Sequence, residues 1–295
     1  MVNQLVCAVT RQPDVASGWR SLVRPNDRVG IKISAAGGEL FTTHRDIVSA
    51  IVSGLVAAGH PRENIVVWDK SLGGIKEAGY TSGEGYLLKS IPPRDGYDPK
   101  ATISAPYLGN LIWGDFEYIG SRGQSLLLSD TENTSSVSHL ANIVAHDVTK
   151  IINLPVLSNS ERNGVAGCLY NVTIPNIDNW RRFSAPPDFG ASGIPEIYSN
   201  PQIGKKVVFN LMDGLLAQYA GGPQSQPNYA FPFATLYASK DPVAIDAIAL
   251  RQLEEWRKKH KLPPIQRLGA HVAVAEQYGL GNANPSRIEI RDVGR

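Results

Sequence analysis

The stretch TKIINLPVLSNSERNGVAGCLYN, residues 149–171, decides the fold class. It begins with a short apolar run rich in β-branched residues, Lys150 to Val156, which predicts a buried strand rather than an amphipathic helix. A polar turn is expected from Ser158 to Asn163, and the small residues after Gly164 are compatible with a helix start. Ligands of open α/β sheets bind just beyond the carboxyl ends of the strands, so we expect the functional site at this loop.

The chain before this stretch reads as strand, helix and strand. Residues 29–33, VGIKI, predict a first strand. A capping box from Thr43 to Asp46, with Asp in place of the usual Glu or Gln, predicts a helix that starts near His44 and ends at Ala58–Gly59. Residues 64–68, NIVVW, predict the next strand, which completes a βαβ unit with a right-handed crossover.

The remaining segments extend this α/β pattern to the whole chain. Residues 1–27 are loosely patterned, and residues 71–136 are rich in Gly, Pro, Ser and Tyr. Further elements are expected as a helix at Val137–Val148, strands at Lys206–Met212 and Phe231–Ala238, and a helix from Asp241 to about His260. The sequence therefore predicts a single α/β domain over residues 1–295, with a mostly parallel β-sheet, helices on both faces and a long loop-rich insertion at about 71–136.

Composition restricts the partners and cofactors. The net charge of +2, from 29 basic and 27 acidic residues, argues against a nucleic-acid-binding surface, so the expected partner is a small molecule. Two cysteines, Cys7 and Cys168, cannot ligate an iron–sulfur cluster. No apolar segment approaches the roughly 20 residues that span a bilayer, so no membrane partner is expected. The chain as given is expected to be cytoplasmic, or periplasmic if a signal peptide has been removed; its oligomeric state stays open.

Five blocks of sequence carry a family resemblance. They are VGIKISAAGGELFTTH; NIVVWDKS with GIKEAGY; TKIINLPVL followed by GVAGCLYN; LMDGLLAQYAGGP; and YASKDPVAIDA. In this order they resemble successive blocks of the domain-of-unknown-function family 362, over about residues 27–282. The resemblance implies an α/β fold and no particular reaction. More distantly, the first strand, the helix start at His44 and the second strand are similar to the N-terminal domain of nickel-dependent lactate racemase, over about 45 residues.

The chain departs from the family pattern at three positions. Many members are expected to carry Lys and His, as K-x-H, in the loop after the central strand, and a Lys immediately before the Asn of the next helix. Here these positions are Ser158, Ser160 and Tyr170, whereas Gly164 and Asn171 match. The resemblance therefore implies a site that has lost its usual cations or has a different chemistry.

Three aspartates each follow a predicted strand, so one crevice could gather their carboxylates. Asp213 and Asp241 are candidate ligands of a divalent metal ion, with Asp69 nearby. Asp69, Lys70 and Asp213 are the candidate catalytic residues, because a carboxylate whose pKa is raised by its neighbours can act as a general base. The alternative is local: Asp241 caps its helix, and the other two aspartates form turns.

Other polar residues are candidates for binding a substrate. Lys32, between two isoleucines in a strand, either faces the crevice or solvates an edge. His44 begins a helix, and Arg181–Arg182, between Trp180 and Phe183, could clamp an anion, although a surface loop is the alternative. The full set of substrate-binding candidates is Lys32, His44, Ser158, Ser160, Tyr170, Asn171, Arg181 and Arg182.

These residues lead to three hypotheses of function. The first is an enzyme that acts on a small polar or anionic molecule by acid–base chemistry, with or without a bound divalent metal. The second is a non-catalytic protein that binds a small molecule or a metal. The third is a partner-binding protein that uses the insertion at 71–136 as its interface.

Overall fold

The computed structural model describes residues 1–93, 95–104, 137–183 and 188–294, although the side chains of Arg181 and Arg182 lie outside this description. A central sheet has its strands in the order β3-β2-β1-β6-β9, and all neighbouring pairs in this row are parallel. β10 pairs antiparallel with β9. β7 pairs parallel with the C-terminal half of β9, and β8 pairs antiparallel with β7. The strands are β1 (Val29–Ile33), β2 (Ile65–Asp69), β3 (Leu87–Ser90), β6 (Lys150–Leu154), β7 (Val156–Ser160), β8 (Gly164–Val165), β9 (Val207–Gln218) and β10 (Ala230–Ser239).

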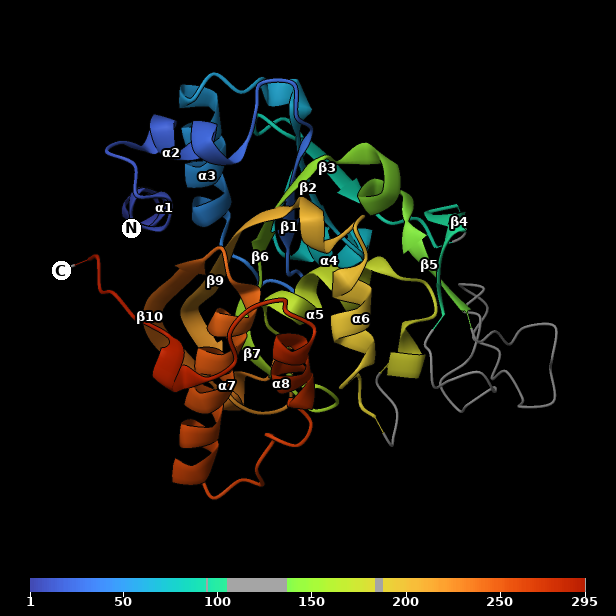
Figure 1. Ribbon diagram of the computed structural model, residues 1–295, viewed down its shortest axis with the longest axis vertical. Coiled ribbons are helices and arrows are strands. Elements are labelled where there is room, and N and C mark those ends of the chain that lie inside the picture. The colour runs from blue at the N-terminus through green and yellow to red at the C-terminus, as the bar shows by residue number, and fades with distance from the viewer. Residues whose placement is uncertain (94, 105–136, 184–187, 295) are drawn as a thin grey trace.

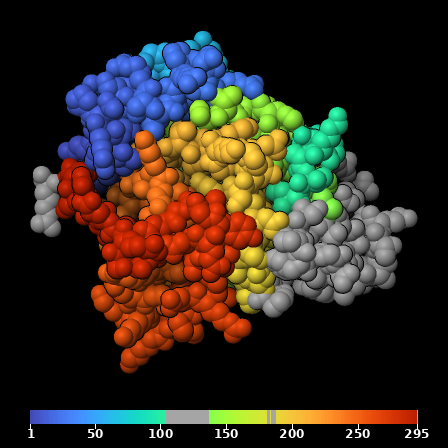
Figure 2. All heavy atoms as spheres, in the orientation of Figure 1, coloured from blue at the N-terminus to red at the C-terminus, as the bar shows by residue number. Residues whose placement is uncertain are grey.

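Helices cover both faces of this mostly parallel sheet, as the sequence predicts (Figure 1). On one face, α1 (Val2–Thr10), α2 (Val15–Leu22) and α3 (Arg45–Ala57) share a core with Ile31, Val67 and Phe209 of the sheet. The other face carries α5 (Cys168–Thr173), α6 (Gly193–Ser199), α7 (Pro242–Lys259) and α8 (Ala270–Gln277). In the space-filling view the N-terminal residues form the upper part of the molecule and the C-terminal residues the lower part (Figure 2).

The central strand is longer than the sequence indicates. β6 and β7 are separated only by Pro155, and β9 pairs with β6 at Asn210 and with β7 at Asp213. Proline has no N–H to donate, but the carbonyl oxygen of Pro155 accepts a hydrogen bond of 2.8 Å from the Asp213 amide, so the ladder continues past it. The polar turn predicted from Ser158 is therefore wrong at its start, and Asp213 lies inside a strand rather than at its end.

Two further local predictions are wrong. Val137–Val148 is not a helix: β5 (Val137–Ala141) pairs with β4 (Tyr97–Ser104), and a short π-helix follows at Ile143–Asp147. The capping box at Thr43 is not used, because the Thr43 hydroxyl donates to the Leu154 carbonyl oxygen at 2.8 Å, and His44 is the residue that precedes α3. Residues 1–27, in which no element was predicted, form α1 and α2.

The insertion contributes both to the sheet and to the walls of the site. α4 (Leu72–Glu77) and β3 lie within it, and residues 105–136 are outside the described part of the chain. The remaining short elements are 3-10 turns at Arg62–Asn64, Ile174–Asn176, Trp180–Phe183, Gly204–Lys206, Pro227–Tyr229 and Pro285–Arg287. Within the described ranges, no helix is long and apolar enough to cross a membrane.

Candidate functional site

A pocket of about 840 Å³ lies beyond the carboxyl ends of β1, β2 and β3. Its walls come from the loops after these strands, from α5 and the turn that follows it, and from Pro223 and Gln224. Pockets that bind small molecules are commonly about 300–1,000 Å³ and mainly apolar, with a few polar groups. Both the position at the strand ends and the size of this pocket are therefore those of a ligand site.

A buried ion pair, in which Lys32 is 0% exposed, lies at one wall of the pocket. The Lys32 ammonium donates to Asp69 Oδ1 at 2.6 Å and to Asn171 Oδ1 at 3.2 Å, and both acceptor residues line the pocket. Asp69 Oδ1 also accepts from the Lys70 amide, and Asp69 Oδ2 accepts from the Ala35 amide, each at 2.7 Å. Burial lowers the pKa of Lys32, and the charge of Asp69 opposes this shift. Lys32 thus points toward the crevice, the first of its two sequence interpretations, and fixes the position of the Asp69 carboxylate.

Buried amides continue this network across the sheet. Lys32, Asn153 and Asn210 are neighbours in register on β1, β6 and β9. Asn153 Nδ2 donates to Asn210 Oδ1 and to the Cys168 carbonyl oxygen, both at 2.9 Å, and Asn153 Oδ1 accepts from Asn171 Nδ2 at 2.9 Å. The sheet therefore holds α5 through hydrogen bonds, which fixes the pocket residues that α5 carries.

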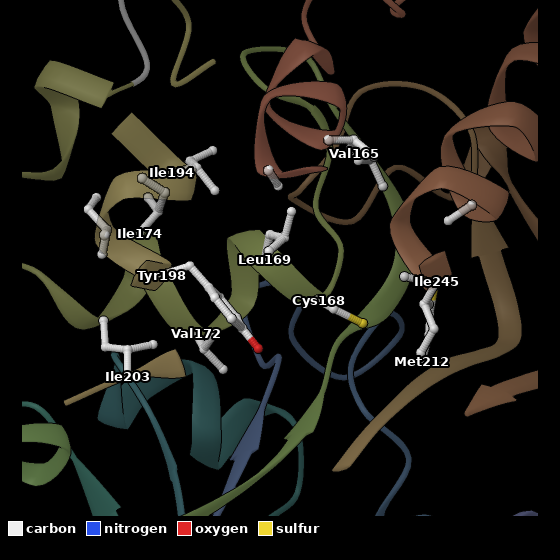
Figure 3. Close-up of a cluster of buried hydrophobic side chains, with 14 of the residues drawn as sticks. Val165, Cys168, Leu169, Val172, Ile174, Ile194, Tyr198, Ile203, Met212 and Ile245 are labelled. Carbon is white, nitrogen blue, oxygen red and sulfur yellow. The ribbon is translucent and has the colours of Figure 1, made fainter. Parts of the chain in front are cut away.

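α5 divides its side chains between the core and the pocket. Leu169 and Val172 pack among the side chains of α6, including Ile194 and Tyr198 (Figure 3). The neighbouring Tyr170 lines the pocket. Burial, and to a smaller degree the charge of Asp69, raises the pKa of Tyr170 to about 12. Its phenol therefore keeps its proton at neutral pH and can donate a hydrogen bond.

Lys70 also lines the pocket, beside an aromatic wall. Its ammonium donates to the Ile177 carbonyl oxygen at 2.9 Å and lies 5.7 Å from the centroid of the Trp180 ring. Such a distance is within the range of a cation–π interaction. Of the predicted site residues, the structure thus gathers Asp69, Lys70, Tyr170 and Asn171 around one pocket, with Lys32 behind them.

His44 and Asp213 form a separate pair. Asp213 is fully buried, and its Oδ2 accepts from the His44 amide at 2.8 Å and contacts His44 Nδ1 at 2.7 Å. The hydrogen bond to Asp213 raises the pKa of His44, whose side chain is 36% exposed. Asp213 is therefore closed off from direct contact with a ligand, and neither residue is among those that line the pocket.

The three candidate carboxylates lie on separate elements. β2, which carries Asp69, and β9, which carries Asp213, have β1 and β6 between them, about 14 Å at roughly 4.8 Å per strand. Asp241 caps α7: its Oδ1 accepts from the Ala244 amide and its Oδ2 from the Asn282 amide, each at 2.9 Å. In the described part of the chain no group of three or more His, Cys, Asp or Glu side chains could hold a metal ion. A divalent metal at Asp213 and Asp241 stays a prediction that this geometry does not favour.

The two serines and the arginine pair lie outside the pocket's described lining. The Ser158 hydroxyl donates to the Asn159 carbonyl oxygen at 2.9 Å, and Ser160 Oγ accepts from the Asn163 amide at 3.0 Å. Both are buried in or next to the sheet and serve the backbone. A substrate contact through Arg181 and Arg182 stays a prediction, because their side chains are not described.

Sequence reasoning missed two acidic residues. Asp178, which lines the pocket, contacts His139 Nδ1 at 2.7 Å through Oδ2, although these residues are 39 positions apart. Asp246 of α7 is fully buried and accepts from the amides of Cys168 and Leu169 at 2.5 and 2.9 Å, so it caps α5. Burial raises the pKa of Asp246 to about 7. The one sequence signal for Asp246 is its helical spacing: it lies among Val243, Ile245 and Ala249, which are buried in α7.

A family model matches residues 29–251 of this chain and spans the strands, α5 and most of α7. The protein belongs to the family described as Domain of unknown function (DUF362). The match includes every residue that the structure places around the pocket, and it confirms the family resemblance of the sequence blocks.

The other comparisons add little to this assignment. No curated protein matches the chain. A crystal structure of a protein from Thermotoga maritima is similar over 89% of this chain and 57% of its own, with 12% sequence identity and a TM-score of 0.45. This DUF362 chain therefore spans less than two thirds of that protein's length. No match supports the resemblance to nickel-dependent lactate racemase, which stays an expectation.

Proposed function

We propose that this DUF362 protein binds a small molecule in the pocket between β2 and α5 and acts on it by acid–base chemistry, with Tyr170 as the proton donor. The observation that carries the proposal is the convergence of Tyr170, Asp69, Lys70 and Asn171 on one largely apolar cavity. The ligand would place an apolar body against the hydrophobic walls and a polar end against these four side chains.

The surroundings of Asp69 assign it a binding rather than a proton-accepting role. Its carboxylate accepts three hydrogen bonds, one of them from the Lys32 ammonium. These donors occupy three of its roughly four acceptor positions, so Asp69 serves as a fixed hydrogen-bond acceptor for the ligand. Tyr170 is the donor of the group: burial raises the pKa of its phenol to about 12, so it stays protonated, donates a hydrogen bond to the ligand and transfers its proton only to a more basic ligand atom.

The same observation about Asp69 supports a second candidate function, a non-catalytic binding protein. If Asp69 only fixes the ligand and no other pocket group takes up a proton, the pocket binds without turnover. A thermal-shift screen of small alcohols, amines and carboxylic acids identifies ligands for either case, and product analysis of each hit by mass spectrometry separates an enzyme from a binder.

Tyr170→Phe tests the role of the tyrosine, because it removes only the hydroxyl. We expect the variant to keep the fold, to bind the hit more weakly and to lose turnover. Tyr237→Phe is the matched control, since Tyr237 is a half-buried tyrosine of β10 outside the pocket lining. Equal binding and turnover in both variants would contradict the proposal for Tyr170.

A further inference from the structure

The carboxylates of Asp69 and Asp178 line the pocket, and each makes three hydrogen bonds with neighbouring protein groups. Asp69 comes from the end of β2, and Asp178 from the segment that follows α5. Their side chains are 10% and 18% exposed, so a small part of each remains open where it lines the cavity. Asp178 is thus a second acidic group of the pocket, contributed by a different wall.

A β-bridge between Leu140 of β5 and Ile177 fixes the position of Asp178. Asp178 Oδ1 accepts from the His139 amide at 2.7 Å and from the Asn179 amide at 2.6 Å, while Oδ2 contacts His139 Nδ1 at 2.7 Å. The Asp178 amide in turn donates to the His139 carbonyl oxygen at 3.2 Å. These contacts set the direction of the carboxylate before any ligand arrives.

The hydrogen bonds that hold each carboxylate leave it some acceptor capacity, and both residues line the pocket. A carboxylate has roughly four acceptor positions. The described residues fill three of them on Asp69 and three on Asp178. Each carboxylate can therefore accept one more hydrogen bond, and an acceptor-only ligand group such as a carboxylate or phosphate cannot supply it.

We propose that Asp178, positioned by His139, is a recognition residue of the pocket and that it accepts a hydrogen bond from a hydroxyl or amino group of the ligand. This inference rests on the proposed function, and it narrows the polar or anionic molecule expected from the sequence to one that carries a donor group. The aromatic side chains of Tyr97 and Trp180 line the same part of the pocket and provide a surface for the apolar body of the ligand.

Three probes with the same benzyl body test the inference: 2-phenylethylamine, 2-phenylethanol and phenylacetate. Their binding to the full chain is measured by ligand-observed NMR titration at neutral pH. We expect the amine and the alcohol to bind, and phenylacetate to bind roughly tenfold more weakly, because one charge-assisted hydrogen bond is replaced by repulsion.

Asp178→Asn is the decisive variant. Its side-chain oxygen can keep both backbone hydrogen bonds, and its NH₂ group can face His139 Nδ1, so the segment can keep its structure. Asp147→Asn is the matched control, because Asp147 pairs with Lys89 outside the pocket lining. We expect Asp178→Asn to weaken binding of the amine roughly tenfold and to remove the discrimination against phenylacetate, and the control to change neither.

The outcomes separate this inference from the proposed function. If the three probes bind equally and Asp178→Asn has no effect, while Tyr170→Phe weakens all three, the role of Asp178 is refuted and the pocket remains the ligand site. If no probe binds to the wild-type protein, both proposals fail.

Discussion

The buried ammonium of Lys32 holds the pocket residues Asp69 and Asn171 in place, and Lys32→Met tests this role. The substitution keeps an unbranched side chain of similar length and removes only the charge and its hydrogen bonds. Three acceptors lose a donor: Asp69 Oδ1, Asn171 Oδ1 and the Ile33 carbonyl oxygen. Lys32 is 0% exposed, so water cannot replace the ammonium without a local rearrangement.

The magnitude follows from what remains around Asp69. Removing one partner of a buried ion pair typically costs about 3–5 kcal/mol, because the other charge is left uncompensated. Asp69 keeps the amides of Ala35 and Lys70 as donors, which places the expected loss at the lower end, about 3 kcal/mol. Since whole domains are stable by only about 5–15 kcal/mol, this loss is readily measured.

The assay is urea denaturation of the wild type, Lys32→Met, Asp69→Asn and the double variant. We expect the double variant to lose at least about 1 kcal/mol less than the sum of the single losses, because it strands no charge. Lys89→Met is the control: its ammonium pairs with Asp147 at the surface, where a pair contributes about 0–1 kcal/mol. A Lys32→Met protein as stable as the control, or strictly additive losses, would contradict the stabilising pairing of Lys32 with Asp69.

Three further predictions concern residues outside this pair. Gly30→Ala should destabilise the protein by about 1–3 kcal/mol, because a Cβ there would lie 2.5 Å from the Trp68 ring; unchanged stability in urea would contradict this packing. The raised pKa of His44 contributes stability that is fully present below the ordinary histidine value of 6.5 and is lost as pH rises through the folded-state pKa. His44→Gln and Asp213→Asn should each remove this decline from a pH series of thermal unfolding. Burial raises the pKa of Asp246 from 3.8 to about 7, so stability that is present below pH 3.8, roughly 4 kcal/mol, is lost as pH rises to 7. The stability difference between wild type and Asp246→Asn should therefore shift against the wild type over this range. A difference that does not change with pH would refute this prediction.

The sequence predicts the parallel sheet because its strands are continuous apolar runs, and the structure confirms this for β1, β2 and β6. It predicts too short a central strand, since Ser158 and Ser160 resemble turn residues. The two serines are buried in β7, where backbone groups satisfy their hydroxyls. These hydrogen bonds are local; what local composition cannot show is the pairing of β7 with β9, which buries the two serines.

The candidate site is predicted only in part, because the sequence does not show which distant segments pair. Asp69 and Lys70 follow a clear strand, and Asn171 lies in a family block, so local signals locate them. Asp178 has no comparable signal, because its partner His139 is 39 positions away and the spacing of residues 137–148 predicts a helix where β5 lies. The sequence places Asp213 at a strand end facing the crevice. In the structure β9 continues through Asp213, whose amide donates to the Pro155 carbonyl oxygen and whose carboxylate contacts His44.

Mapping a bound ligand by NMR distinguishes the pocket beside α5 from the His44–Asp213 pair as the functional site. A hit from the thermal-shift screen is titrated into ¹⁵N-labelled protein, and the amide shifts are followed for the loop after β2, for α5 and for the segment at Asp178. We predict that the largest shifts occur at Lys70, Tyr170, Asn171 and Asp178, with small shifts at His44 and along α7. Shifts concentrated at His44 and Asp213, or along α7, would contradict the assignment of the pocket as the functional site.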